Sequence, residues 1–192
     1  MEDEILFQGA GYTIARTARA ETSVPYGAAA RHDGNRNYGW IDVRGRPELV
    51  DSIPEVQRST GLAHLLRAIA APQSPIMSSA CECAAFERVG ESNRRWQVGG
   101  FVVVMFQDAD LNADSQNLVN LATQILRGIA PTQEHQIGFE LTIEPLRTFF
   151  GRGDCFALML KALGYGREEA DAWSAFGYAA SAAGDSITHA MG

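Results

Sequence analysis

Cys155 is the residue whose chemistry depends most on where the chain places it. It follows the short segment 151–154 (Gly-Arg-Gly-Asp) and precedes an apolar run that predicts a helix over residues 154–163. The unpaired N–H groups and the dipole at a helix N-terminus stabilise a thiolate, so they lower the pKa of a cysteine placed there. Cys155 is therefore a candidate catalytic nucleophile, with His135 and His189 as candidate bases.

The order of His135 and Cys155 in the chain resembles that of circularly permuted papain-like hydrolases. In that group a cysteine at the start of a helix pairs with a histidine on a strand, so the resemblance implies a thiol-dependent hydrolase or transferase. No recognisable motif surrounds His135, however, and the sequence shows no oxyanion donor or orienting residue. A structural interpretation is favoured, with Asp154 as a helix cap and Cys155 as a small buried hydrophobe.

A second candidate site is the acidic segment that follows the most apolar strand. Its alternate positions carry oxygen ligands, which is similar to the first half of a calcium loop and to the metal and sugar-nucleotide motif of glycosyltransferases. Ala113 and Val119, however, stand where a calcium loop needs glycine and a bidentate glutamate, and the nucleotide-binding half of a glycosyltransferase is missing. Helix capping explains the segment without a metal and is favoured. The candidate ligands of a divalent cation are Asp108, Asp110, Asn112 and Asp114.

The remaining cysteines and histidines predict no other metal site and no bound cofactor. Cys81 and Cys83 lie on one face of a predicted strand, with Cβ atoms about 7 Å apart, which is too far for an unstrained disulfide. Together with an odd total of three cysteines, this indicates free thiols. The four histidines show no paired spacing that is typical of a metal site.

Hydrophobic spacing predicts the elements that position these residues. Leu62, Leu65, Leu66 and Ile69 follow helical spacing after a capping-box pattern at residues 52–55, with a break expected within residues 57–61. A turn at residues 90–93 predicts a hairpin, in which Gly99 and Gly100 mark a bulge or a close backbone approach. The predicted strands are 38–43, 76–88, 95–107 and 136–144, with an edge strand within 12–20; the predicted helices are 118–129, 154–163 and 167–183.

This order of elements favours one α+β domain with a ferredoxin-like βαββαβ core, in which an antiparallel sheet carries its helices on one face. The resemblance is topological, and it implies no activity because this fold hosts many functions. We divide the chain into an irregular segment 1–36, an α+β core 37–145 and a helical extension 146–192 of the same domain. In strand 136–144 we expect the side chains of Glu140, Thr142 and Glu144 to face solvent, because they alternate with apolar ones.

Composition limits the classes of function. The formal net charge of −7 disfavours a nucleic-acid binder, and the longest apolar run, residues 101–106, is far shorter than the roughly 20 residues of a membrane helix. Without a recognisable secretory signal, we expect a soluble cytoplasmic protein with no membrane partner. We expect a non-catalytic binding or assembly module that engages a protein partner, another copy of itself or a small ligand through its sheet face or C-terminal helices. The thiol-dependent enzyme is the alternative.

Overall fold

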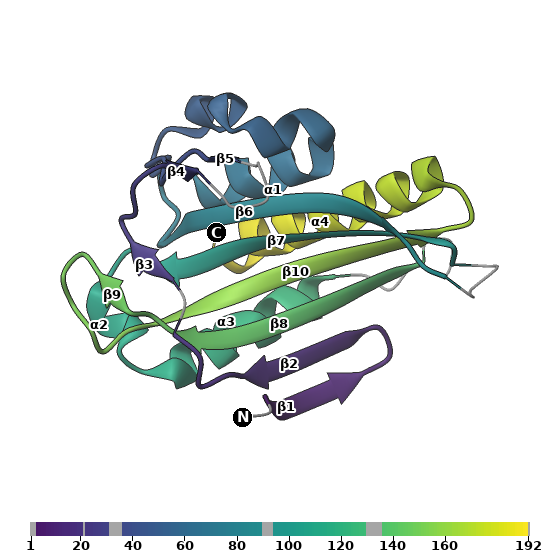
Figure 1. Ribbon diagram of the computed structural model, residues 1–192. Coiled ribbons are helices and arrows are strands. Elements are labelled where there is room, and N and C mark those ends of the chain that lie inside the picture. Colours follow the sequence, from purple (N-terminus) through teal and green to yellow (C-terminus); the bar gives the residue numbers. More distant parts are fainter. Residues whose placement is uncertain (1–2, 21, 31–35, 90–93, 130–135, 192) are drawn as a thin grey trace.

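The computed structural model describes residues 3–20, 22–30, 36–89, 94–129 and 136–191. Its centre is a six-stranded sheet with the order β1-β2-β8-β10-β7-β6 (Figure 1). All neighbouring strands are antiparallel except β2 and β8, which are parallel. The strands are β1 (Glu4–Gly9), β2 (Tyr12–Arg16), β6 (Ile76–Glu87), β7 (Trp96–Phe106), β8 (Ile137–Pro145) and β10 (Phe156–Gly166).

The helices lie on one face of this sheet (Figure 1). The long helix α4 (Glu169–Met191) packs on β10 and β7, α3 (Ser115–Gly128) packs on β10 and β8, and α1 (Thr60–Ile69) packs on α4. The large buried core between helices and sheet includes Leu66, Leu118, Leu160 and Phe176. Short elements complete the described chain: β3 (Ser23–Val24), β4 (Ala29–Ala30), β5 (Arg36–Asn37), η1 (Pro47–Ser52), η2 (Pro54–Arg58), α2 (Ala109–Asn112) and β9 (Thr148–Phe149).

The opposite face of the sheet is partly covered by the paired strands β3 and β9. Val24 and Phe149 of this pair form a second, smaller core with Met105 of β7 and with Cys155. Thr22, beside β3, donates a hydrogen bond to Glu144 of β8 at 3.0 Å. Glu144 is therefore 5% exposed, and the prediction that it faces solvent is wrong, although Glu140 on the same strand is exposed.

The helix predicted over residues 154–163 is wrong, because this segment belongs to the central strand β10. Leu160 faces the helices, while Met159 packs on the smaller core of the opposite face. A central strand that is apolar on both faces loses the alternation that marks a half-buried strand. The leucine, alanine and methionine content favours a helix locally, but pairing with β7 and β8 on both sides overrides that preference.

The strand predicted over residues 38–43 is also wrong, since this segment is irregular. It is held by side chains instead: Val43 is buried, and the Trp40 indole N–H donates to the backbone oxygen of Ser78 at 3.3 Å. With one predicted strand absent and one predicted helix replaced by a strand, the elements that follow β1 and β2 are, in order, helix, two strands, helix, two strands, helix. The structure is mixed α+β with a mostly antiparallel sheet, and this sheet contains two strands, β1 and β10, that the predicted four-stranded core lacks.

Other expectations are confirmed. The predicted hairpin appears as β6 and β7, and the helices predicted over residues 118–129 and 167–183 appear as α3 and α4. The predicted edge strand appears as β2, within residues 12–20, although β1 covers its outer edge. The break after residue 57 is also present: α1 begins only after Ser59, whose side chain accepts from the Leu62 N–H at 3.2 Å. The capping box predicted at residues 52–55 is wrong, because the residue that precedes η2 makes no side-chain cap.

Glycines let α4 lie against the sheet. A Cβ atom on Gly100 would lie 2.5 Å from Cζ of Phe176, and a Cβ atom on Gly164 would lie 2.8 Å from the Cα atom of Phe176. The predicted close approach at Gly100 is thus confirmed, while the bulge in this hairpin lies in β6, between Ser78 and Ala80. No helix in the described part of the chain is long and apolar enough to cross a membrane.

Candidate functional site

Cys155 does not lie at a helix N-terminus, so the premise of the predicted nucleophile is wrong. It immediately precedes β10, is 1% exposed, and directs its Sγ atom to the backbone oxygen of Ala109 at 3.7 Å. Burial raises the pKa of this thiol, against the opposing effect of the Arg152 guanidinium. The thiol is therefore protonated at neutral pH and lacks the activation that a cysteine nucleophile needs.

The two candidate bases do not complete a catalytic pair with Cys155. His135 lies outside the described residues. His189 lies in the last turn of α4, where its Nδ1 atom is 2.8 Å from the backbone oxygen of Asp185. Because α4 packs on one face of the sheet and Cys155 belongs to the small core on the other, the fold separates His189 from the thiol.

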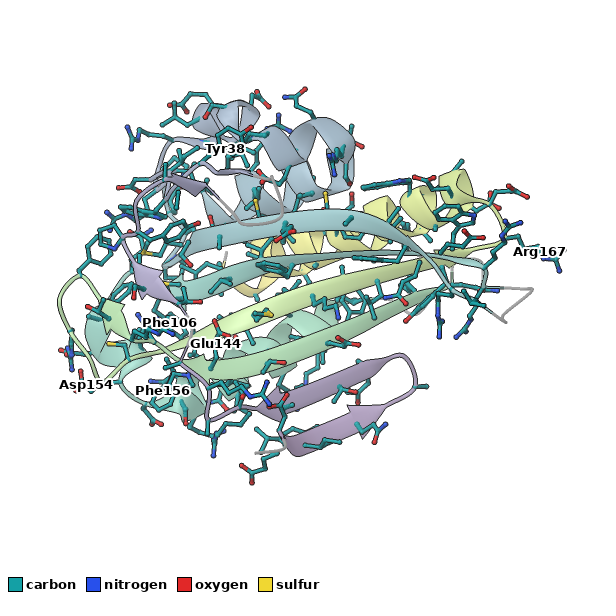
Figure 2. The ribbon with its side chains drawn as sticks, in the orientation of Figure 1. Tyr38, Phe106, Glu144, Asp154, Phe156 and Arg167 are labelled. Carbon is teal, nitrogen blue, oxygen red and sulfur yellow. The ribbon has the colours of Figure 1, made fainter. Side chains whose placement is uncertain are left out.

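The acidic segment caps two helices, as the favoured interpretation predicts. Asp108 accepts from the Asp110 N–H ahead of α2, and Asp114 accepts from the N–H of Gln116 ahead of α3, both at 2.9 Å. Asp110 forms an ion pair with Arg152. Arg152 is two residues before Asp154, which Figure 2 labels at this end of the sheet. Within the described ranges, no group of three or more His, Cys, Asp or Glu side chains is placed to hold a metal ion.

Asn112, the fourth predicted ligand, is a structural residue. Its side chain is fully buried and bridges both backbone groups of Phe106, accepting from the N–H at 2.8 Å and donating to the oxygen at 2.9 Å. Phe106 is the last residue of β7, where the ladder with β6 ends. The Asn112 amide therefore fixes the exit from β7 into α2.

A cleft of about 880 Å³ lies against β6, the edge strand of the sheet. We call it the edge cleft. Its lining comes from residues 22–29 and 38–41, from the region around η2, and from residues 78–84 of β6, with Leu66 of α1 and Phe101 of β7. In Figure 2, Tyr38 lies with the segments above this strand. The side chains that matter below are Tyr26, Tyr38, Glu55, Arg58, Ser79 and Phe101.

Two side-chain bonds, from Tyr26 and from Trp40, reach the β6 bulge. The Tyr26 hydroxyl donates to the backbone oxygen of Ser79 at 2.9 Å, next to the bond from Trp40 to Ser78. A bulge turns backbone groups out of the regular ladder, so these two carbonyls point away from β7 and accept from the covering segment. The bulge also places Ser79 in the lining of the edge cleft.

The Ser79 hydroxyl is buried without a hydrogen-bond partner among the described residues. Its side chain is 5% exposed. In the described ranges, one other buried side-chain atom has no hydrogen-bond partner, the Nε atom of Arg16. The guanidinium of Arg16, however, also lies 3.7 Å from the Glu4 carboxylate through its Nη1 atom. Ser79 has one polar atom, and a buried hydroxyl left unpaired costs about 1–3 kcal/mol.

Burial and the Glu55 carboxylate favour the neutral forms of the Tyr26 phenol and of the Cys81 and Cys83 thiols in the edge cleft. Burial, followed by the charges of Cys81 and Glu55, raises the pKa of Tyr26 to about 12. Burial also raises the pKa of Cys83 to about 11, although Arg58 acts in the opposite direction, and it raises the pKa of Cys81. All three cysteines are free, as predicted, and the cleft thiols are not activated nucleophiles.

Ser79, Tyr26 and Glu55 stand out little in the sequence. Two adjacent serines at positions 78 and 79 interrupt the apolar start of β6, and they are the available signal for Ser79. They break the alternation of the strand at the point where the bulge adds one residue. Tyr26 and Trp40 carry no such signal, because they reach β6 through tertiary contacts.

Comparisons with known proteins add no relative to this picture. No family model, no curated protein and no solved structure matches the chain.

Proposed function

We propose that this chain is a non-catalytic binding module whose edge cleft holds a small ligand or a segment of a protein partner. The observation that carries the proposal is the Ser79 hydroxyl, buried in the lining of the cleft and unpaired within the described chain. Buried polar groups in native proteins are nearly always paired, and an exception calls for an explanation. A bound ligand that supplies the missing partner is that explanation.

The chemistry of the lining supports binding over catalysis. Aromatic side chains from Tyr26 and Phe101 provide apolar contact area, while Glu55, Arg58 and Ser79 provide polar groups. The lining combines apolar contact area with several polar groups, and placed polar groups of this kind fix the orientation of a bound molecule. The thiol-dependent alternative lacks an activated nucleophile, because burial raises the pKa of Cys155 and of both cysteines in the cleft.

The test compares two buried serines that differ in their hydrogen bonding. Ser186 in α4 is 2% exposed and donates to the backbone oxygen of Ile125 at 2.7 Å. Ser186→Ala should therefore lose about 1–2 kcal/mol of unfolding free energy. Ser79→Ala removes a hydroxyl that has no partner among the described residues, so in the free protein it should be neutral or stabilising.

Ligand affinity should be affected in the opposite order: Ser79→Ala should weaken binding, and Ser186→Ala should leave it unchanged. A library of small organic fragments and tripeptides, screened by ¹⁵N–¹H NMR, should give hits whose shifts map to β6 residues 78–84 and to Tyr26. Those hits should bind Ser79→Ala several-fold more weakly and Ser186→Ala as well as the unsubstituted chain. Hits that map elsewhere, or hits that ignore Ser79→Ala, would contradict the proposal, as would a Ser79→Ala variant as destabilised as Ser186→Ala.

A further inference from the structure

The outer edge of β6 presents regularly spaced backbone groups to the edge cleft. Arg88 and Arg95 are opposite each other, and the Arg88 N–H donates to the Arg95 oxygen. Hydrogen-bonded pairs recur at every second residue of an antiparallel ladder. Glu82 and Ala84 therefore direct their N–H and C=O groups to β7, whereas Cys81, Cys83 and Ala85 direct theirs outward.

Contacts of the outward carbonyls agree with this assignment. The Cys83 oxygen lies 3.5 Å from Nη1 of Arg58, on the side away from β7. The outward oxygens of Ser78 and Ser79 accept from Trp40 and Tyr26. Among the described residues, no hydrogen bond reaches the outward N–H groups of Cys81, Cys83 and Ala85.

Beyond the bulge, the part of this edge from Cys81 to Ala85 has little of the usual protection against pairing with another chain. Natural edge strands are commonly short, carry proline or lysine, or lie under a helix or loop. β6 has 12 residues, none of them proline or lysine. Its edge borders the edge cleft up to Ala84, and Ala85 lines a second hollow of about 430 Å³ together with Arg58 and Trp173.

We infer that an extended peptide carrying a lysine or arginine binds in the edge cleft as an additional strand paired with β6. The inference rests on the proposed function and names the class of ligand. Outward groups from Cys81 to Ala85 span about 13 Å, at roughly 3.3 Å a residue. An extended peptide matches this spacing with its own N–H and C=O groups, which is the recognition mode known as strand addition.

Charge selects the side chain of the peptide. Glu55, which lines the edge cleft from η2, contributes behind burial to the raised pKa of Tyr26, Cys81 and Cys83, and Arg58 opposes it only at Cys83. A cationic side chain placed opposite Glu55 is therefore attracted into the cleft. The same contact fixes the register of the added strand, which alternating apolar side chains alone leave free to slip by two residues.

Backbone methylation of a peptide tests strand addition directly. The probe is the acetylated and amidated heptapeptide Thr-Val-Thr-Lys-Thr-Val-Thr. One isomer carries N-methyl groups on the lysine and both valines, and the other carries them on the two inner threonines. Since one set of N–H groups faces β6 and the other faces away, one isomer should bind within about twofold of the parent. The other should lose about tenfold or more, because two or more ladder hydrogen bonds are removed.

Amide hydrogen exchange gives a second measurement on the protein itself. The N–H groups of Cys81 and Cys83 should exchange faster than those of Glu82 and Ala84 in the free chain. Saturating parent peptide should slow the first pair at least about tenfold, with little change in the second pair. Glu55→Gln should weaken the parent peptide about two- to fivefold at low salt, and should leave a peptide with norleucine in place of lysine unaffected.

The outcomes separate this inference from the function on which it rests. If fragments bind at Ser79 while both methylated isomers bind equally, or while no peptide binds, strand addition is wrong and the edge cleft remains a ligand site. If neither fragments nor peptides perturb the cleft, the proposed function is wrong as well. If light scattering shows a dimer whose β6 amides are already protected, the occupant is another copy of this chain and the peptide inference is wrong.

Discussion

The crossing of α1 and α4 predicts opposite effects for the same substitution at two glycines that touch. A Cβ atom added to Gly61 of α1 would stand 2.7 Å from the carbonyl carbon of Gly177 in α4 and 2.8 Å from its Cα. A Cβ atom added to Gly177 meets no atom closer than the Ser59 Oγ, at 3.8 Å. Gly61→Ala and Gly177→Ala are therefore a matched pair at one contact.

The magnitudes follow from packing and helix propensity. Carbon atoms prefer separations of about 3.5–4.0 Å, so Gly61→Ala requires the two helix backbones to separate by about 1 Å. Overpacking of this kind costs about 3 kcal/mol at the upper end of its usual range, and the gain in helix propensity returns at most about 1 kcal/mol. Gly61→Ala should lose about 2 kcal/mol, whereas Gly177→Ala should gain about 0.5–1 kcal/mol.

Urea denaturation followed by circular dichroism measures both changes. With an unchanged m-value, the midpoint should fall for Gly61→Ala and rise for Gly177→Ala. The melting temperature should fall by roughly 4–8 °C in the first variant and rise by a few degrees in the second. Equal losses in both variants, or a Gly61→Ala variant as stable as the parent, would show that the helices do not approach as closely as described.

Three further predictions concern residues of the site and its surroundings. Folding raises the pKa of the Tyr26 phenol from 10.0 to about 12, so the unfolded chain ionises first and the free energy of unfolding falls as pH rises from 10 towards 12. Tyr26→Phe should remove part of that fall, and identical alkaline unfolding curves for the two proteins would refute the assignment. Asn112→Ala should lower the free energy of unfolding, measured by urea denaturation, by about 3 kcal/mol, because it leaves both Phe106 backbone groups unpaired. Millimolar calcium or manganese should not raise the melting temperature of the unsubstituted chain, and a rise would restore the metal hypothesis. Iodoacetamide at neutral pH should label the three cysteines of the folded chain at least about tenfold more slowly than those of the unfolded chain, and preferential labelling of Cys155 in mass spectra would contradict its burial.

Elements with a clear local signal could be predicted from the sequence, whereas the central strand β10 could not. The apolar stripe of α3 and the turn between β6 and β7 are local signals, which fix an element without knowledge of its neighbours. β10 carries no such signal, because both of its faces are buried and a run of leucine and alanine suits a helix equally well. Its strand conformation is decided by pairing on both sides with β7 and β8.

The same distinction explains the candidate site. Capping by Asp114 is local and could be predicted, since its side chain acts on an N–H two residues away, and Asp108 caps α2 in the same way. The edge cleft depends on Tyr26 reaching Ser79, two residues that are far apart in the chain. Cys155 is buried, as the favoured interpretation predicts, but the helix expected after it is a strand. A helix N-terminus would lower the pKa of this thiol, whereas burial at the start of β10 raises it.

The parallel pairing of β2 with β8 has a consequence for the order in which the chain folds. Tyr12 is opposite Phe139 in this pair, so almost the whole core separates the two strands in the sequence. A ribosome adds about 5–20 residues per second, so β8 is made roughly ten seconds after β2, which until then can pair only with β1. During translation the β1–β2 hairpin is therefore a two-stranded ribbon whose outer edges are open to pairing with other chains.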